Sequence, residues 1–213
     1  YTYGGWKDNN GNIYNKTNRL YSVSGADNGL TVIWKANSYT INYSGMEGAT
    51  LSPMPTAHVY GTNTAIADPV KTGYTFNGWK VNGGAAVKNL TLGATDYTNV
   101  ISLQATWIAN KYTVTFDKQN GTGGSTSAAA TFNSAMPAIT VPTRPGYTFG
   151  GYYTAKNGGG TQYYTSSGAS ARNWNIAANT TLYAKWTAKT YTVTFDKQNG
   201  TGGSTSAAAT FNG

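Results

Sequence analysis

The segment Gly146-Tyr147-Thr148-Phe149-Gly150-Gly151-Tyr152-Tyr153 has a close copy earlier in the chain, Gly73-Tyr74-Thr75-Phe76-Asn77-Gly78-Trp79. A shortened copy, Tyr1-Thr2-Tyr3-Gly4-Gly5-Trp6, stands at the start. The first tyrosines of the three copies are 73 residues apart (74 − 1 = 73, 147 − 74 = 73). Self-similarity at a fixed period is typical of tandem structural repeats. We therefore predict several small domains in place of one large domain.

The composition favours strands and tight turns. Only 10% of the 213 residues are charged, against roughly 25% in ordinary globular proteins, whereas glycine (27) and tyrosine (17) are abundant. No stretch keeps the apolar spacing of an amphipathic helix. The fold class that we predict is mainly β, built from short strands between glycine-rich turns.

The repeat boundaries follow from strands that recur in order. Each unit opens with alternating residues, as in 39–43 and 112–116, and closes on a tryptophan, as in 103–107 and 182–186. Residues 191–212 match 112–133 residue for residue. The third unit is six residues longer than the second, and we place the insertion near 163–172. The predicted domains are the C-terminal part of a repeat at 1–37, complete repeats at 38–110 and 111–189, and the N-terminal part of a next repeat at 190–213.

Short linkers join these units. Four residues separate each closing tryptophan from the next opening tyrosine, and they read KANS, IANK and TAKT. Five peptide steps span at most about 17 Å. Since the linkers contain neither proline nor glycine, we predict that neighbouring repeats nearly touch and that the array forms an elongated, semi-rigid rod.

The aromatic side chains of the motif are interpreted as core. A domain of this size without a disulfide or metal needs large anchors, and each aromatic ring buries about 150–250 Å². Packing is favoured over stacking on sugar rings. The exceptions are the Tyr152-Tyr153 and Tyr163-Tyr164 pairs, which we expect to be exposed, because adjacent strand residues face opposite sides of a sheet. The weak candidates for facing a ligand are Tyr153, Tyr163 and Tyr164. The predicted core residues are Tyr74, Phe76, Trp79, Trp107, Tyr112, Phe116, Tyr147, Phe149 and Trp186.

The net charge of +8 raises the question of a polyanionic partner such as an acidic glycan or an anionic cell-wall polymer. The basic residues are scattered, and the only close pairs are Lys16/Arg19 and Lys185/Lys189. We therefore interpret the charge mainly as a contribution to solubility, keep a polyanion site as the alternative, and expect no nucleic-acid partner. No apolar run reaches the ~20 residues of a membrane span.

Residues suited to catalysis or metal binding do not gather in the sequence. The chain has no cysteine, which excludes disulfides and cysteine-ligated zinc. The single histidine, His58, has no counterpart in the next repeat and is interpreted as incidental. Asp117 and Asp196 share one repeat position, and each is expected to cap the turn that follows it. Asp8 opens a polar turn that lacks the glycine and glutamate of a calcium loop. We expect no cofactor, no metal and no enzymatic activity.

Several motifs in order resemble a known family. Tyr-Thr-Val-Thr-Phe-Asp at 112–117, Met-Pro at 136–137, Pro-Thr-Arg-Pro-Gly-Tyr-Thr-Phe-Gly-Gly-Tyr-Tyr-Thr at 142–154 and Leu-Tyr-Ala-Lys-Trp at 182–186 together resemble the Listeria–Bacteroides repeat, the internalin-type B-repeat. The resemblance is best over 112–186 and good over 39–107; it covers 1–34 and 191–213 as fragments. It departs from the family at Val70-Lys71-Thr72 and at Gly151-Tyr152.

The resemblance implies a small β-grasp-like (ubiquitin-like) repeat in an extracellular bacterial surface protein or appendage. Such repeats occur in tandem and project or support an adhesive domain from the cell wall. The predicted function is a structural stalk or fibre repeat whose partners are neighbouring repeats of the same chain or filament. The alternative is an adhesion module that binds a surface glycan or another polyanion.

The partial repeats at the two ends leave two interpretations open. The sequence is a window from a longer array of repeats, or the ends of successive molecules complement each other head to tail. The first interpretation is the one we favour.

Overall fold

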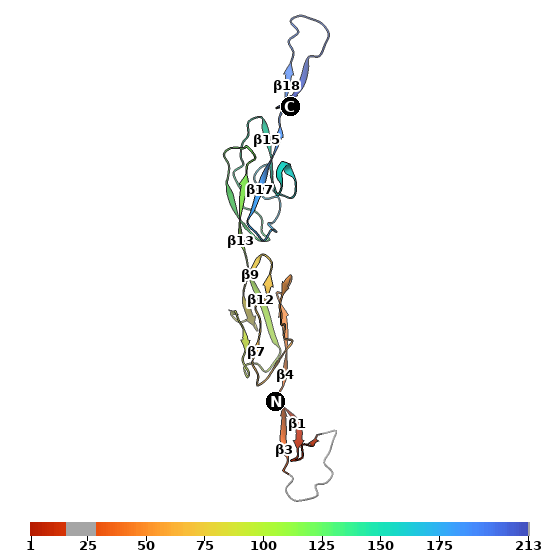
Figure 1. Ribbon diagram of the computed structural model, residues 1–213, viewed down its shortest axis with the longest axis vertical. Helices are drawn as coiled ribbons and strands as arrows, with labels where there is room; N and C mark the ends of the chain where they lie inside the picture. Colours follow the sequence, from red (N-terminus) through yellow and green to blue (C-terminus); the bar gives the residue numbers. More distant parts are fainter. Residues whose placement is uncertain (16–28, 213) are drawn as a thin grey trace. The chain divides into compact units, whose positions relative to one another are not determined.

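A computed structural model describes residues 1–15 and 29–212 of the chain (Figure 1). Lys16 and Arg19, one of the two close basic pairs, lie outside these ranges. Within them the chain consists of strands and turns, apart from one short 3-10 turn, η1 (Lys156–Gly158). Its contacts divide the chain into two units, Tyr1–Lys71 with Phe76–Ile108, and Thr72–Thr75 with Ala109–Gly213.

The third repeat is one five-stranded sheet. The strand order is β14 (Ser127–Thr131), β13 (Lys111–Asp117), β17 (Thr180–Ala188), β15 (Tyr147–Tyr153) and β16 (Gln162–Tyr164). The opening strand β13 and the closing strand β17 lie side by side and run parallel, with Val114 opposite Thr180. The other three pairings are antiparallel. The first and last strands of the repeat therefore form the centre of its sheet.

The second repeat has the same arrangement. Its strand order is β10 (Ala86–Val87), β9 (Tyr74–Val81), β12 (Ile101–Ala109), β4 (Ser38–Ser44) and β6 (Ala57–Val59). Strands β4 and β12 are parallel, with Ile41 opposite Ile101. Two short ladders complete it: β5 (Ala49–Thr50) with β8 (Val70–Lys71), and β7 (Thr64–Ala65) with β11 (Thr91–Leu92). The prediction of a mainly β chain is confirmed, whereas the β-grasp-like class and the rod stay predictions.

The end segments contain parts of the same plan. At the start, β2 (Ile13–Tyr14), β1 (Thr2–Lys7) and β3 (Thr31–Lys35) form a three-stranded sheet in that order. At the other end, β18 (Thr190–Thr194) and β19 (Ser206–Thr210) form a hairpin. The expected four-residue linkers are largely strand, because β12 and β13 are separated only by Asn110, and β17 and β18 only by Lys189.

In both complete repeats, the tryptophan of the closing strand makes a hydrogen bond to the turn after the opening strand. The indole Nε1 of Trp186 donates a hydrogen bond to the carbonyl of Lys118, 2.8 Å away, in the turn after β13. Trp107 donates in the same way to the carbonyl of Gly45, at 2.8 Å, in the turn after β4. Phe149 and Phe76 pack against these indoles with ring centroids 5.4 and 5.3 Å away. The closing strand is therefore tied to the opening strand by a side chain as well as by the ladder.

The insertion in the third repeat lies mainly before the place that we expected. Tyr152 pairs with Tyr164 in the third repeat, and the equivalent pair in the second repeat is Trp79 with Val87. The sequence offset between equivalent residues is 73 before the β15–β16 connection (152 − 79) and 77 after it (164 − 87). Four of the six extra residues therefore belong to the connection that contains η1, and only two follow Tyr164. A longer turn leaves the sheet order unchanged, because loop closure costs little more for a few added residues.

Gly151, the last glycine of the motif, forms a β-bulge. Gly151 has φ of +114°, and the register of β15 on β17 shifts between Phe149 and Gly151. A Cβ at Gly151 would lie 2.2 Å from the carbonyl oxygen of Tyr164. Gly78 repeats the feature with φ of +135° and a Cβ position 2.7 Å from the nitrogen of Val87. Only glycine combines this backbone conformation with so close a neighbouring strand.

We predict that Gly151→Ala destabilises the third repeat by about 1–3 kcal/mol, because it places a side chain in a strained conformation and against a backbone carbonyl. Gly150→Ala is the matched control. Its Cβ would meet only the flexible Lys185 side chain, 3.2 Å away, and its φ is not in the left-handed region, so we expect less than about 1 kcal/mol. Urea unfolding of the two variants measures the difference, and equal midpoints would contradict the role of the bulge.

Candidate functional site

The adjacent tyrosines expected to face a ligand are mostly buried. Tyr163 is 2% exposed and Tyr164 is 0% exposed, so the expectation that this pair is exposed is wrong. Strand β16 places the two rings on opposite faces, as predicted, but both faces are covered. Tyr163 packs against Trp174, with centroids 4.7 Å apart, and Tyr164 packs edge-on against Phe116 at 5.4 Å. The connection after β16, which carries Trp174, covers the second face.

The other pair is divided between core and surface. Tyr152 is fully buried and stacks on Phe116 with ring centroids 4.5 Å apart. Tyr153 is half-buried, and the ammonium group of Lys185 lies 5.7 Å from its ring centroid. Of the three candidates for contacting a ligand, Tyr153 alone keeps a partly open face.

Seven of the nine core residues predicted from the motif lie in the two cores or pack against them. Phe76, Trp79, Phe116 and Phe149 are buried, at 8%, 0%, 6% and 8% exposure. The remaining five are half-buried. Trp107, Tyr112 and Trp186 pack against the cores, whereas Tyr74 and Tyr147 pair with Phe132 and Phe211. Trp174 is a fully buried core residue that the motif comparison missed, because it belongs to a connection without a counterpart of equal length in the second repeat.

The polar residues that were considered as catalytic or metal-binding candidates make local hydrogen bonds instead. His58 is buried and its Nδ1 lies 2.9 Å from the hydroxyl of Thr64. Asp117 and Asp196 accept hydrogen bonds from the backbone nitrogens of Gln119 and Gln198, each at 3.0 Å, which confirms their role as turn caps. The Gln119 backbone bond is the main reason that the pKa of Asp117 is lowered.

Asp8 is occupied by its own turn. Its carboxylate accepts hydrogen bonds from the backbone nitrogens of Asn10 and Asn12, from the Asn12 amide and from the Tyr14 hydroxyl. The Asn12 side chain contributes most to lowering the pKa of Asp8. Throughout residues 1–15 and 29–212, histidine and acidic residues nowhere form a group of three that is suited to holding a metal ion.

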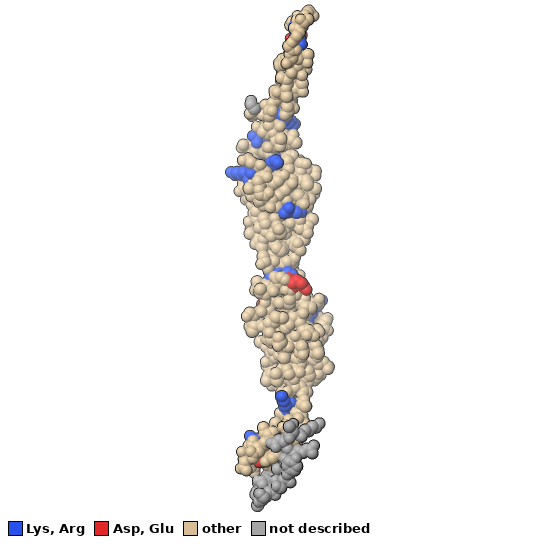
Figure 2. All heavy atoms as spheres, turned by 90° about the vertical axis from the view of Figure 1, so that its right-hand side faces the viewer, with Lys and Arg blue, Asp and Glu red and all other residues tan. Residues whose placement is uncertain are grey.

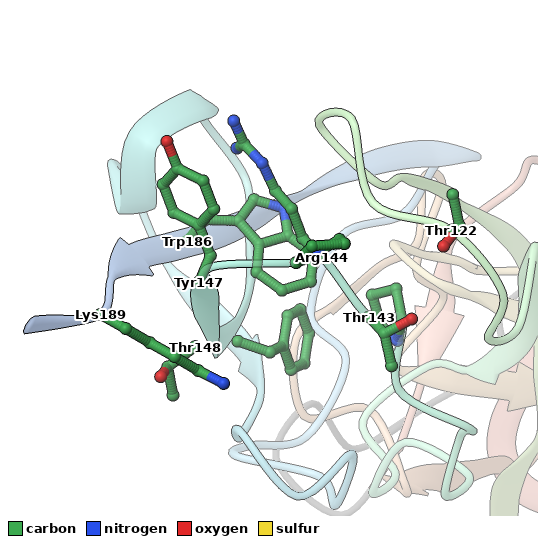
Figure 3. A pocket seen from close by; sticks show the side chains of 10 residues that line it. Thr122, Thr143, Arg144, Tyr147, Thr148, Trp186 and Lys189 are labelled. Atoms are coloured by element: carbon green, nitrogen blue, oxygen red, sulfur yellow. The ribbon is translucent and has the colours of Figure 1, made fainter. Parts of the chain in front are cut away.

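One hollow in the third repeat combines basic, aromatic and hydroxyl side chains. It has a volume of about 440 Å³ and lies where β15 and β17 meet the prolines that precede the motif (Figure 3). Trp186 and Phe149 line its apolar wall, while Arg144 and Lys189 supply positive charge. The full lining is Thr122, Pro142, Thr143, Arg144, Pro145, Tyr147, Thr148, Phe149, Trp186 and Lys189.

The hollow is positively charged, and stacking on Tyr147 holds the Arg144 side chain in place. The guanidinium carbon of Arg144 lies 3.8 Å from the ring centroid of Tyr147, and its Nη1 donates to the carbonyl of Gln119 at 3.4 Å. Lys189 is exposed, and the lining contains no carboxylate. The sequence reasoning missed this cluster because Arg144 and Lys189 are 45 residues apart (189 − 144 = 45), and only the pairing of β15 with β17 brings their segments together.

The hollow stands out from a surface on which charge is sparse. Figure 2 shows the lysine and arginine side chains of one face as separate spots on a largely uncharged surface. In the second repeat, Lys71 and Asn110 hold the positions of Arg144 and Lys189. The two complete repeats therefore differ by one positive charge at this place.

No helix in the described part of the chain combines the length and the apolarity that a membrane crossing needs.

Comparisons with known proteins identify the repeated unit. The Listeria-Bacteroides repeat domain matches residues 39–105 and 112–185, which confirms the resemblance seen in the motifs. The chain is 27% identical over 94% of its length to a protein of Evansella cellulosilytica named "Putative Gly-rich membrane protein", and 37% identical over 62% of its length to internalin H of Listeria monocytogenes. It spans only about a quarter of these relatives, 24% and 23%. No solved structure matches it.

The buried tyrosines lead to a prediction for alkaline pH. Burial raises the pKa of both Tyr152 and Tyr164 to about 12, and their hydroxyls have no hydrogen-bond partner among the described residues. In the unfolded chain both ionise near pH 10. The free energy of unfolding is therefore unaffected by these two groups below pH 10. It falls as the pH rises from 10 to about 12, because the unfolded chain loses protons that the folded chain keeps.

The measurement is absorbance of tyrosinate at 295 nm. At pH 11 a tyrosine with a pKa of 10 is about 91% ionised and one with a pKa of 12 about 9% ionised. We therefore expect this pair to give the folded chain about 1.6 fewer ionised tyrosines than the unfolded chain. Tyr164→Phe should reduce this deficit by about half and leave stability at neutral pH unchanged or improved, because it removes a buried hydroxyl without a hydrogen-bond partner among the described residues. Full ionisation of the folded chain at pH 11 would contradict the prediction.

Proposed function

Because this chain belongs to the Listeria-Bacteroides repeat domain family, we propose that it is a structural stalk segment of an extracellular bacterial surface protein, where it spaces or supports an adhesive part. The names of the relatives, an internalin and a membrane protein, support a place at the cell surface. The proposal includes no catalysis and no cofactor.

The observation that carries the proposal is the parallel pairing of the first and last strands. In an antiparallel pair the chain would return to the end of the sheet where it began. Since β13 and β17 are parallel, with Asp117 opposite Tyr183, the chain enters the third repeat at one end of the sheet and leaves it at the other. In the register of the pair, Lys111 is level with position 177, and Ala188 lies 11 residues further along (188 − 177 = 11). At about 3.3 Å per strand residue, the chain advances about 36 Å between entry and exit. Each repeat thus adds length to the chain's path.

The β-grasp-like class and the rod belong to the same proposal. The order of five strands, with a parallel central pair flanked by antiparallel neighbours, supports a β-grasp-like unit. The near absence of residues between β12 and β13 and between β17 and β18 supports a stiff array, because a single connecting residue has few conformations to explore.

The stalk proposal predicts an elongated particle in solution. A compact globule of 213 residues has a radius of gyration of about 17 Å. Small-angle X-ray scattering of the chain should give a value well above this, with a single cross-sectional radius for the rod. A radius near 17 Å would refute the stalk, and scattering typical of a flexible chain would refute its stiffness.

The alternative, a module that binds an anionic glycan or cell-wall polymer, is favoured by the hollow around Arg144 and Lys189. A guanidinium stacked on an aromatic ring loses little freedom when it binds a carboxylate or sulfate. Trp186 and Tyr147 beside it offer apolar surface of the kind that packs against sugar rings. Under this alternative the third repeat binds better than the second, which has Lys71 and Asn110 at these positions.

Elution from a heparin column tests the alternative. We expect the double variant Arg144→Gln, Lys189→Gln to elute at lower salt than a control that loses the same charge elsewhere, Lys7→Gln, Lys88→Gln, because only the first pair lines the hollow. Loss of the first pair should also reduce the dependence of retention on salt. Equal elution of the two variants would assign retention to net charge alone, and no retention at low salt would remove the alternative.

A further inference from the structure

Three aromatic pairs in the chain share one geometry. They are Tyr1 with Tyr60, Tyr74 with Phe132, and Tyr147 with Phe211, and in each the ring centroids are 5.5 Å apart, with interplanar angles of 86°, 79° and 80°. In each pair, one ring is the first tyrosine of a motif copy. The other ring comes directly after the strand of the next repeat that pairs antiparallel with its opening strand: Tyr60 follows β6, Phe132 follows β14 and Phe211 follows β19. The first pair lies within one unit and the other two lie within the second.

Backbone hydrogen bonds accompany the rings. The nitrogen of Phe211 donates to the carbonyl of Lys189, and the nitrogen of Lys189 donates to the carbonyl of Gly146, both at 2.9 Å. The same two bonds, at the same distances, link Phe132 to Asn110 and Asn110 to Gly73. The ring is therefore held by a short ladder as well as by its contact with tyrosine.

The first glycine of the motif leaves room for the incoming ring. A Cβ at Gly146 would lie 2.4 Å from the ring of Phe211, and a Cβ at Gly73 would lie 2.4 Å from the ring of Phe132. Both glycines have positive φ, +76° and +79°. The ring thus rests on the bare backbone of glycine, with the edge of the tyrosine beside it.

The last hairpin shows what this contact supports. In the third repeat, Val114 and Phe116 of β13 are buried, at 0% and 6% exposure. Their counterparts in β18, Val193 and Phe195, are 44% and 46% exposed. The hairpin of β18 and β19 therefore lacks the core that its sequence fills in a complete repeat, while Phe211 keeps the same contact as Phe132.

We propose that the Gly-Tyr pairs Gly73-Tyr74 and Gly146-Tyr147 are docking sockets whose partner is the next repeat, which inserts the aromatic ring at the end of its first hairpin. The socket couples each repeat to its successor and holds the first hairpin of the successor through a contact outside that successor's own core. This inference rests on the proposed structural role of the tandem array. It makes the stability of a repeat depend on its neighbour, as in other linear arrays.

Hydrogen exchange of the 213-residue chain tests the socket. In Phe211→Ala we expect the amides of β18 and β19 to exchange about tenfold faster or more, since an aromatic pair and its burial contribute on the order of 1.4 kcal/mol, which is a factor of ten. Phe195→Ala is the matched control: it removes the same ring from the same hairpin outside the socket and should change exchange less than about threefold.

A second variant approaches the socket from the other side. Gly146→Ala should also release the hairpin, because its new methyl group occupies the place of the ring. In the Phe211→Ala background it should add little further effect on β18 and β19, as expected for residues that act through one contact. Fully additive effects, an unchanged hairpin in Phe211→Ala, or a hairpin unprotected in the parent chain would each overturn the proposal. Exchange reports on the hairpin alone, so a failed socket and a failed stalk give different results in exchange and scattering.

Discussion

The parallel pairing of the opening and closing strands in the middle of each sheet is the constraint on which the rest of this chain depends. It brings distant residues into register, Val114 opposite Thr180 (180 − 114 = 66) and Ile41 opposite Ile101 (101 − 41 = 60). It also places the closing tryptophan over the turn that follows the opening strand, where its indole finds a backbone carbonyl. Because the pair is parallel, entry and exit lie at opposite ends of the sheet, which is the property that a stalk segment needs.

The motif strand is fitted to this centre by two glycines with different roles. Gly151 and Gly78 have positive φ and let the neighbouring edge strand approach within a distance that no side chain would permit. Gly146 and Gly73 expose backbone to a ring supplied by the following copy. The motif therefore contributes both to the core of its own repeat and to the contact with the next repeat. Its aromatic residues have separate roles in the two. Phe149 and Phe76 face the core, while Tyr147 and Tyr74 face the incoming ring.

The two complete repeats share their sheet and differ in one connection, in part of the core and in surface charge. The third has a longer β15–β16 connection and a buried Trp174, and it carries Arg144 and Lys189 where the second has Lys71 and Asn110. Structural identity is thus maintained by the strands and glycines, whereas charge is free to vary around the hollow. This division fits the proposed stalk, and the extra charge at the hollow fits the alternative proposal of an anionic ligand.

The sequence by itself determined the period, the β character, the family and most of the core, because identical spacings of aromatic residues and glycines recur in copies that can be compared directly. It also located the turn caps Asp117 and Asp196, which act on backbone two residues away. Only the tertiary structure decided the strand order, the burial of Tyr163 and Tyr164, the placement of Arg144 and Lys189 on the lining of one hollow, and the contact of Phe211 with Gly146. These depend on which distant strands become neighbours and on what covers each face of a sheet, and residue alternation within one strand carries no information about either.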